Sequence, residues 1–297
     1  MSDANRSATV RIGPAGWSYR DWIGPVYPAQ SKVDELLTIA TYFTCVELNS
    51  SFYRVPSPRL VESWAERIGG KGDFKFTVKV WQRFTHEMKG SREEAERFIE
   101  VFRPLLARAR VGAFLLQFPW SFSDGRSERR LLETLGAWFG SHPTAVELRH
   151  GSWNTPEAMA FLAGCGLSFC NIDQPIIGPA MPPTDIATSP RLGYIRLHGR
   201  NYRNWARRDA ERDERYDYLY ADGELEEWKE RSRRLASKVG ELYIITNNHF
   251  RGQALVNALQ LRSMLEERRQ EVPPPLLTAY PVLEAIAANP TPRDTLF

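Results

Sequence analysis

Polar side chains that could do chemistry follow several apolar segments of this 297-residue chain, at the point where each segment ends. The segment CVELNSSFYRVP, which starts at Cys45, has the pattern of a β-strand that carries Glu47 and Asn49. Because side chains alternate across a strand, these two point the same way. A carboxylate and an amide on one face of an otherwise apolar strand predict a site to which other strands also contribute.

The same design recurs later in the chain. Two-residue spacing places Glu147 beside Arg149 and Arg196 beside His198. Two carboxylates in unequal surroundings can titrate apart, which acid–base catalysis requires, so Glu47 and Glu147 are the predicted acid–base pair. The later segments that turn polar at their ends are VELRH (146–150), FCNID (169–173), YIRLHG (194–199) and YIITNNH (243–249).

Cations at the same strand ends would hold an anionic substrate such as a phosphate or a carboxylate. The amides of Asn49 and Asn248 would orient it, and Trp17, Tyr53 and Trp153 would stack against its flat parts. The predicted anion clamp is Lys79, Arg149, Arg196 and His198. The catalytic candidates are Glu47, Glu147, Asp173 and His198, and the substrate-binding candidates are Trp17, Asn49, Tyr53, Lys79, Gln117, Arg149, His150, Trp153, Arg196, Arg200, Asn248 and His249.

A structural alternative uses the same charges without chemistry. Lys79, Arg149 and Arg196 could simply neutralise Glu47 and Glu147, because buried ions must be paired. The numbers of positive and negative side chains are nearly equal, so this network is a competing interpretation of the same residues.

A metal site is a third interpretation. His150, His198 and His249 could join the carboxylates around a divalent ion at the strand ends. These histidines show no HxH, HxxH or HExxH spacing, however, and the arginines and the lysine nearby would repel a cation. We therefore expect no bound cofactor and no metal ligand, with a divalent metal as the alternative.

The stretch RNYRNWARR (200–208) has four arginines, a tyrosine, a tryptophan and no acid. Such a pattern can grip phosphates while aromatic rings stack on bases or sugars. Acidic residues from 209 to 214 cancel much of this charge, so a solvated lid is the alternative, and the net charge of +3 is far from that of a dedicated nucleic-acid coat. A small anionic ligand is the expected partner and nucleic acid is the alternative; nothing predicts the oligomeric state.

The elements that must position these residues alternate along the chain. Eight strand-like segments are each followed by a longer connection, and helical spacing recurs in most of these. Predicted helices include 92–109, 127–139 and 253–268. This pattern at this length favours an α/β fold, a single-domain (β/α)8 barrel of the TIM type, over a doubly wound sheet. The long loops leave the strand ends, which marks that rim as the working face.

The chain shows no linker that would divide it. We expect a disordered tail over 1–9 and one domain over 10–297, with the segment from about 270 packing on the barrel exterior. No apolar run approaches the ~18 residues that a membrane span needs, and no apolar leader segment is present. Three cysteines without CxxC spacing fit free thiols in a reducing compartment. The expected location is the cytoplasm, without membrane contact.

With these motifs assembled, the chain resembles the DUF72 family, also called the YecE-like family. The resemblance runs from about Val10 to Leu277 and implies a TIM-type barrel without naming a reaction. The motifs are GPAGWSYRDW with a downstream YP, VELNSSFYRVP, FTVKV with a nearby TH, LLQFP, VELRHGSW, YIRLHGRN, RYDYLY and TNNHFRGQALVNALQL.

The leading expectation is an enzyme, a hydrolase, lyase or isomerase, that acts on a small or nucleotide-like anionic substrate by carboxylate acid–base chemistry. A noncatalytic nucleic-acid-binding barrel is one alternative. A metal-dependent phosphoesterase or isomerase, similar in fold to the endonuclease IV group, is another; this chain lacks the histidine-rich ligand set of those enzymes.

Overall fold

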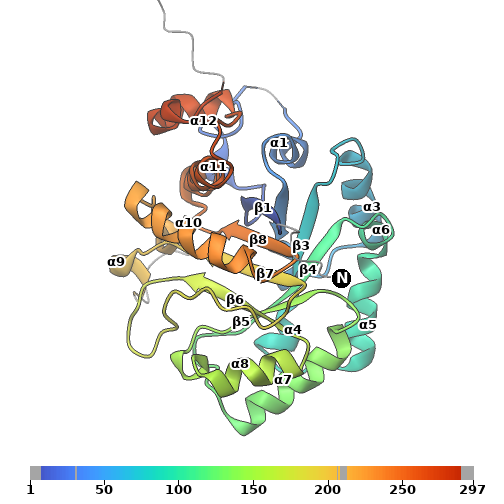
Figure 1. Cartoon of the computed structure of the whole chain (residues 1–297). Coiled ribbons are helices and arrows are strands. Elements are labelled where there is room, and N and C mark those ends of the chain that lie inside the picture. The colour runs from blue at the N-terminus through green and yellow to red at the C-terminus, as the bar shows by residue number, and fades with distance from the viewer. Residues whose placement is uncertain (1–7, 31, 206, 208–212, 289–297) are drawn as a thin grey trace, which may run out of the picture.

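The computed structural model describes residues 8–30, 32–205, 207 and 213–288. Eight parallel strands follow the order β1-β8-β7-β6-β5-β4-β3-β2, so each strand lies beside its sequence neighbour (Figure 1). This arrangement confirms the predicted (β/α)8 barrel. The strands are β1 (Thr9–Pro14), β2 (Cys45–Leu48), β3 (Lys75–Lys79), β4 (Val111–Gln117), β5 (Thr144–Glu147), β6 (Ser168–Asp173), β7 (Leu192–Leu197) and β8 (Glu241–Thr246).

The barrel closes where β1 meets β2. The Gly16 amide donates to the Glu47 carbonyl at 2.8 Å, and the Thr44 amide donates to the Ile12 carbonyl at 3.3 Å. Gly13 is required at this seam, because a Cβ there would lie 1.8 Å from the Cys45 carbonyl oxygen. The two strands therefore approach closely only because one of them lacks a side chain at this point.

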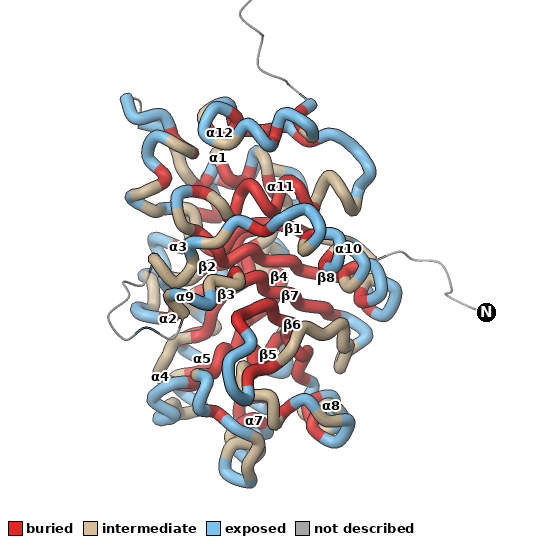
Figure 2. The backbone as a smooth tube through the Cα atoms, turned by 90° about the vertical axis from the view of Figure 1, so that its left-hand side faces the viewer, coloured by how far each residue is buried: buried red, intermediate tan, exposed pale blue. Residues whose placement is uncertain are grey.

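Helices cover the outside of the strands, and Figure 2 shows the buried barrel at the centre of partly exposed helices. Local signals start several of them: Ser91 and Glu94 form a capping box, and the Thr155 hydroxyl caps the helix that begins at Pro156. The helices are α1 (Glu35–Tyr42), α2 (Ser50–Tyr53), α3 (Pro58–Arg67), α4 (Gln82–Thr85), α5 (Arg92–Val101), α6 (Arg103–Leu106), α7 (Arg126–Phe139), α8 (Pro156–Gly164), α9 (Tyr202–Trp205), α10 (Asp222–Ala236), α11 (Gln253–Glu266) and α12 (Pro274–Ala279). Short 3-10 turns are η1 (Arg20–Trp22), η2 (Gly151–Trp153), η3 (Asp213–Tyr216), η4 (Phe250–Gly252) and η5 (Pro281–Ala285).

The helix predicted over 92–109 is wrong in one respect, since it is two helices, α5 and α6, that meet at Phe102. Pro104 explains the break, because it has no N–H to donate to the preceding turn and fits instead in the first turn of a new helix. By contrast, the long connection over 174–191 contains no helix.

The chain ends differ little from expectation where they are described. Strand β1 begins at Thr9, one residue earlier than predicted, and residues 1–7 of the predicted tail lie outside the described residues. After α11, the segment with α12 and η5 lies against the outside of the barrel, where the Tyr280 hydroxyl donates to the Arg251 carbonyl at 3.0 Å (Figure 1). In the part that the structure describes, no helix has the length and apolarity to cross a bilayer.

Candidate functional site

Arg196 is the centre of the barrel mouth. It points inward from β7, and its two terminal nitrogens bond different carboxylates: Nη2 donates to Glu47 from β2 at 2.5 Å, and Nη1 donates to Glu147 from β5. All three side chains are fully buried. The Tyr194 hydroxyl donates to the second oxygen of Glu47 at 2.9 Å. One guanidinium thus ties three strands together across the barrel.

The second oxygen of Glu147 is also engaged. Arg149 Nε donates to it at 2.6 Å, and His198 Nε2 lies 3.3 Å away. Burial alone would raise the pKa of the Glu147 carboxyl, but the charges of Arg196 and Arg149 and the contact with His198 hold this pKa well below its usual range. Glu147 therefore stays ionised at all pH values at which the protein would work.

His198 is neutral, because burial lowers its pKa to about 3 despite the attraction of Glu147. Its Nδ1 lies 3.0 Å from the Asn247 side-chain nitrogen, which can only donate. Nδ1 is thus the acceptor and Nε2 carries the proton toward Glu147. His198 positions the carboxylate and adds no positive charge to the predicted anion clamp.

Lys79 differs from Arg149 and Arg196 in its contacts and in the direction of its pKa shift. It is 9% exposed, and its ammonium lies 3.9 Å from the centre of the Phe52 ring. Burial, and then the charge of Arg196, lower its pKa to about 7, although the charges of Glu147 and Glu47 oppose this. Within the described ranges, Lys79 forms no ion pair, and each carboxylate oxygen of Glu47 and Glu147 accepts a bond from another side chain.

A polar cavity of about 160 Å³ opens at this point, at the C-terminal ends of the strands. Many of the predicted residues line this cavity. Glu47, Glu147 and His198 do not, because they are fully buried behind Arg196, where a ligand in the cavity cannot contact them. The predicted residues that line it are Asn49, Tyr53, Lys79, Gln117, Arg149, Arg196 and His249.

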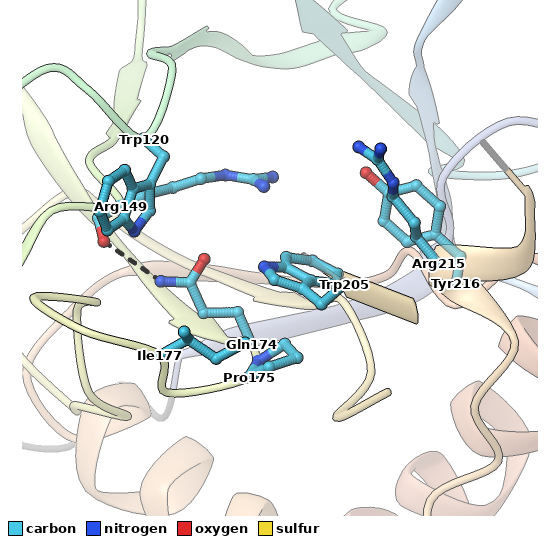
Figure 3. A pocket seen from close by; sticks show the side chains of 8 residues that line it. All are labelled: Trp120, Arg149, Gln174, Pro175, Ile177, Trp205, Arg215 and Tyr216. Carbon is cyan, nitrogen blue, oxygen red and sulfur yellow. Dashed lines mark hydrogen bonds between the residues drawn. The ribbon is translucent and has the colours of Figure 1, made fainter. Parts of the chain in front are cut away.

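Two less polar cavities flank the central cavity. One, of about 370 Å³, shares Arg149 and Tyr216 with it; Figure 3 shows the Arg149 guanidinium reaching from one side toward Arg215 and Tyr216 on the other. The second, of about 360 Å³, shares Asn49 and Tyr53, and predicted Trp17 lines it. The shared walls allow one ligand to occupy the central cavity and extend sideways.

Asp173 and Arg200 do not reach the cavity. The alternation in FCNID decides this: Ile172 pairs in register with inward-facing Arg196, so Asp173 faces outward. There it accepts bonds from Trp228 Nε1 at 3.0 Å and from Arg200 Nε at 3.0 Å. Both side chains join β6 to α10 and lie outside the central cavity.

Three further candidates are turned away from the mouth. His150 Nδ1 accepts from the Ser152 amide at 3.2 Å and caps η2. Trp153 is fully buried, with its Nε1 donating to the Phe122 carbonyl at 2.9 Å. Asn248 is also buried, and its amide donates at 2.8 Å to Asn257 of α11. These contacts direct the three side chains toward neighbouring elements, and none of the three lines the central cavity.

Four residues to which the prediction gave no substrate-binding role also line the central cavity: Phe52, His86, Tyr216 and Asn247. Asn247 had a usable signal, because it shares the inward parity of Tyr243 and Ile245 on β8. Phe52 and His86 lie in turns after the strands, where parity no longer applies. Tyr216 comes from the charged excursion after β7, and only the folded chain shows that this residue lies at the mouth.

The described residues of the mouth do not form a set of metal ligands. In the described ranges, no group of three or more His, Cys, Asp or Glu side chains converges in a way that could hold one. The carboxylates behind the cavity are taken by arginines, and the imidazole of His198 directs its proton at Glu147.

The fold and the mouth together define the class: a (β/α)8 barrel with a polar, cation-rich cavity at the C-terminal ends of its strands. The chain belongs to the family described as "Protein of unknown function DUF72", whose model matches residues 11–281. It is 30% identical over 271 residues to the UPF0759 protein YunF of Bacillus subtilis (strain 168), which covers 86% of this chain and 95% of that protein.

Solved structures agree with this assignment. A DUF72 family protein from Thermotoga maritima MSB8 is 37% identical, with a TM-score of 0.77 over 87% of this chain and 99% of that one. A DUF72 family protein from Enterococcus faecalis V583 is 27% identical, with a TM-score of 0.77 over 87% of this chain and 96% of that one. The resemblance seen in the motifs is confirmed, and so is the barrel.

Proposed function

We propose that this chain is an enzyme that binds a small anionic substrate in the central cavity. The observation that carries the proposal is the Lys79 side chain, a buried cation at a polar cavity that has no carboxylate partner among the described residues. Buried charges in proteins are paired or held by a ligand, so an unpaired one at a cavity wall calls for an anion.

The charge balance of the mouth supports this. Glu47 and Glu147 are negative, and Arg149 and Arg196 neutralise them through direct bonds. Protonated Lys79 therefore leaves one excess positive charge. A monoanion such as a carboxylate would restore neutrality, and the outer edge of Arg149 could share in binding it.

Glu47 and Glu147 have a different role in this proposal from the acid–base role that their spacing suggests. Both are fully buried behind Arg196, and Glu147 is held ionised. We assign them the task of fixing the two arginines, which in turn leaves Lys79 without a partner. The proton transfers of the reaction then fall to groups that line the cavity.

The flanking cavities bear on the size of the substrate. Trp120, Ile177 and Trp205 line the larger one and provide flat, apolar surface beside Arg149. A nucleotide-like molecule would place its anionic group in the centre and its ring against these side chains. A ligand of few atoms would occupy the central cavity alone.

Calorimetric titration with lactate, phosphate and adenosine monophosphate tests the proposal. We expect at least one of these anions to bind, and the Lys79→Met variant to lose about tenfold or more in affinity through the missing charge. Lys75→Met is the matched control, because Lys75 lies on the same strand at the end away from the mouth and pairs with Asp73 at 3.2 Å.

Equal affinity of the wild-type protein and Lys79→Met would contradict the proposal, as would the absence of binding at low salt. The alternative of a nucleic-acid partner predicts a different pattern: short oligonucleotides would bind with strong salt dependence, and replacing Arg203 and Arg207 would weaken that binding. Such a result would move the function from the cavity to the excursion after β7.

A further inference from the structure

Lys79 has the surroundings of a nucleophile as well as those of an anion-binding group. Its amine rests on the Phe52 ring, at 3.9 Å from the ring centre, and opens into the polar cavity. No hydrogen bond of this amine to another described residue is present, whereas the amine of Lys75 on the same strand contacts Ala109 and Asp73. The reactive atom is therefore not engaged elsewhere.

The neighbouring charges favour the neutral amine. The guanidinium groups of Arg196 and Arg149 stay positive, and the carboxylates beside them are already occupied. With burial acting first and the Arg196 charge next, the pKa of Lys79 falls to about 7. About half of the Lys79 side chains are then uncharged at neutral pH, against roughly one in a few thousand for an ordinary lysine. Desolvation beside other cations is a known way to activate a lysine amine.

The charge and size of the central cavity indicate which electrophile the Lys79 amine would attack. A neutral amine adds to a carbonyl carbon, and a cationic wall favours a carbonyl compound that carries a negative charge. Arg149 and the amide of Asn49 line the same cavity and can hold a carboxylate. At about 160 Å³ the central cavity is smaller than the ~300 Å³ of a drug-sized ligand site, which suits a molecule of few heavy atoms.

We infer that Lys79 forms an imine with the carbonyl carbon of a small 2-oxo acid whose carboxylate is bound by Arg149. The inference rests on the proposed anion site and names the substrate class and the covalent step for it.

The step balances without an oxidant or a reductant. The Nζ lone pair forms a bond to the carbonyl carbon, and the carbonyl π electrons move to oxygen, which takes up a proton. Nitrogen then loses a proton and the hydroxyl oxygen takes up a second one. The nitrogen lone pair forms the C=N bond while the C–O bond breaks, so that one water leaves and a protonated imine remains. The protonated imine can draw electrons from a neighbouring bond, as in lyases and isomerases that work through a lysine.

His86 is the candidate for the accompanying proton transfers. It lines the same cavity, and burial together with the charges of Lys79 and Arg149 lowers its pKa to about 4. Its imidazole is therefore neutral at neutral pH and can accept a proton.

Reductive trapping tests the imine directly. The purified full-length protein is incubated with pyruvate, and in parallel with 2-oxoglutarate, in the presence of sodium cyanoborohydride. We expect the intact mass to rise by one carboxyethyl group in the pyruvate reaction, and peptide mapping to place the adduct on Lys79. Lys79→Arg keeps the positive charge but should lose the adduct, while Lys75→Arg should retain it.

The pH dependence separates Lys79 from surface lysines. Its trapping rate, divided by that of a free lysine peptide in the same tube, should be constant below about pH 6 and fall steadily above about pH 7, because the neutral fraction of the peptide amine keeps rising after that of Lys79 has levelled off. An unselective distribution of label over many lysines, or label that persists in Lys79→Arg, would overturn the inference. Mapping of the wild-type protein gives this answer even if the variant does not fold.

Binding of lactate tests the anion site separately from the imine. Lactate has the carboxylate of pyruvate but no carbonyl, so its binding reports the site alone. Binding of lactate and pyruvate without an adduct at saturating pyruvate would refute the imine and leave the anion site standing. If neither acid binds, the imine fails, and the proposed function fails with it only if phosphate and adenosine monophosphate do not bind either.

Discussion

At the scale of single residues, Arg196 decides the electrostatics of the mouth. Its guanidinium lies between Glu47 and Glu147, and its Nε has no hydrogen-bond partner among the described residues. Burying three charged groups carries a desolvation cost that their attraction only partly offsets. Stabilisation of the barrel alone therefore does not explain this arrangement. We infer that Arg196 occupies both carboxylates and so leaves Lys79 without a carboxylate partner among the described residues.

The pKa of Lys79 leads to a prediction on anion binding. Lactate attracts the protonated amine, so its affinity should be constant below about pH 7 and then fall by about tenfold for each further pH unit. The fall stops at the higher pKa that Lys79 has in the complex. Calorimetric titration between about pH 6 and about pH 9 measures this dependence.

Lys79→Arg is the control for that experiment, because a guanidinium remains charged over the same range. Its lactate affinity should not change with pH. A wild-type affinity that is equally flat would mean that Lys79 is not the group that the anion meets.

At the scale of elements, strand β6 shows how alternation sorts polar residues. Asn171 and Asp173 lie on one side, and Cys170 and Ile172 on the other. Asn171 accepts from the Thr184 hydroxyl at 2.7 Å in the loop outside the barrel. The polar pair of this strand therefore faces outward and anchors the surrounding elements, whereas the charged residues Glu47 of β2, Glu147 of β5 and Arg196 of β7 face inward.

The Arg200 side chain belongs to this anchor. It pairs with Asp173 at 3.0 Å and with Glu224 at 3.1 Å, and Asp173 is fully buried. Arg200→Ala should therefore lower the free energy of unfolding by about 2–4 kcal/mol, because it leaves a buried carboxylate without its cation. Urea denaturation measures the loss.

Arg203→Ala is the matched control in the same arginine-rich stretch. Arg203 is exposed, so its replacement should change stability by less than about 0.5 kcal/mol. Lactate affinity should be unchanged in Arg200→Ala at a temperature where the variant is folded. A loss of affinity with full stability would restore Arg200 to the binding site.

At the scale of the whole molecule, closure of the barrel depends on the β1–β2 seam. Gly13→Ala would place a methyl group 1.8 Å from the Cys45 carbonyl oxygen, in a position where backbone must move. We expect a loss of at least about 2 kcal/mol in stability, measured by urea denaturation. Lactate affinity should fall as well, because β2 carries Asn49 into the cavity.

Gly164→Ala tests whether the effect is specific to the seam. Gly164 ends α8, and a Cβ there meets nothing within 4 Å. This substitution should leave stability unchanged or raise it by up to about 1 kcal/mol. Similar losses in both variants would show that the seam has no special role in closure.

The sequence alone determined the barrel and much of the mouth. Strand and helix periods are local properties of the chain, so alternating segments were enough to predict eight strands in a closed sheet. The two-residue period also put Glu47, Glu147 and Arg196 on inward faces, where the structure has them. The same period places His150 and Asn248 on the opposite face from inward-facing Arg149 and Asn247, and the structure agrees, so these two predictions departed from the alternation. Trp153 lies in a turn, where the alternation no longer applies.

Only the tertiary structure decided which charges pair. Arg196 meets Glu47 across 149 positions of sequence and Glu147 across 49, and no local pattern contains those distances. These pairings leave Lys79 as a cation of the mouth with no carboxylate partner among the described residues. The structure also showed that Tyr216, from the excursion after β7, lies at the cavity wall. Ion pairs and loop positions depend on contacts between distant segments, and such contacts exist only once the barrel has closed.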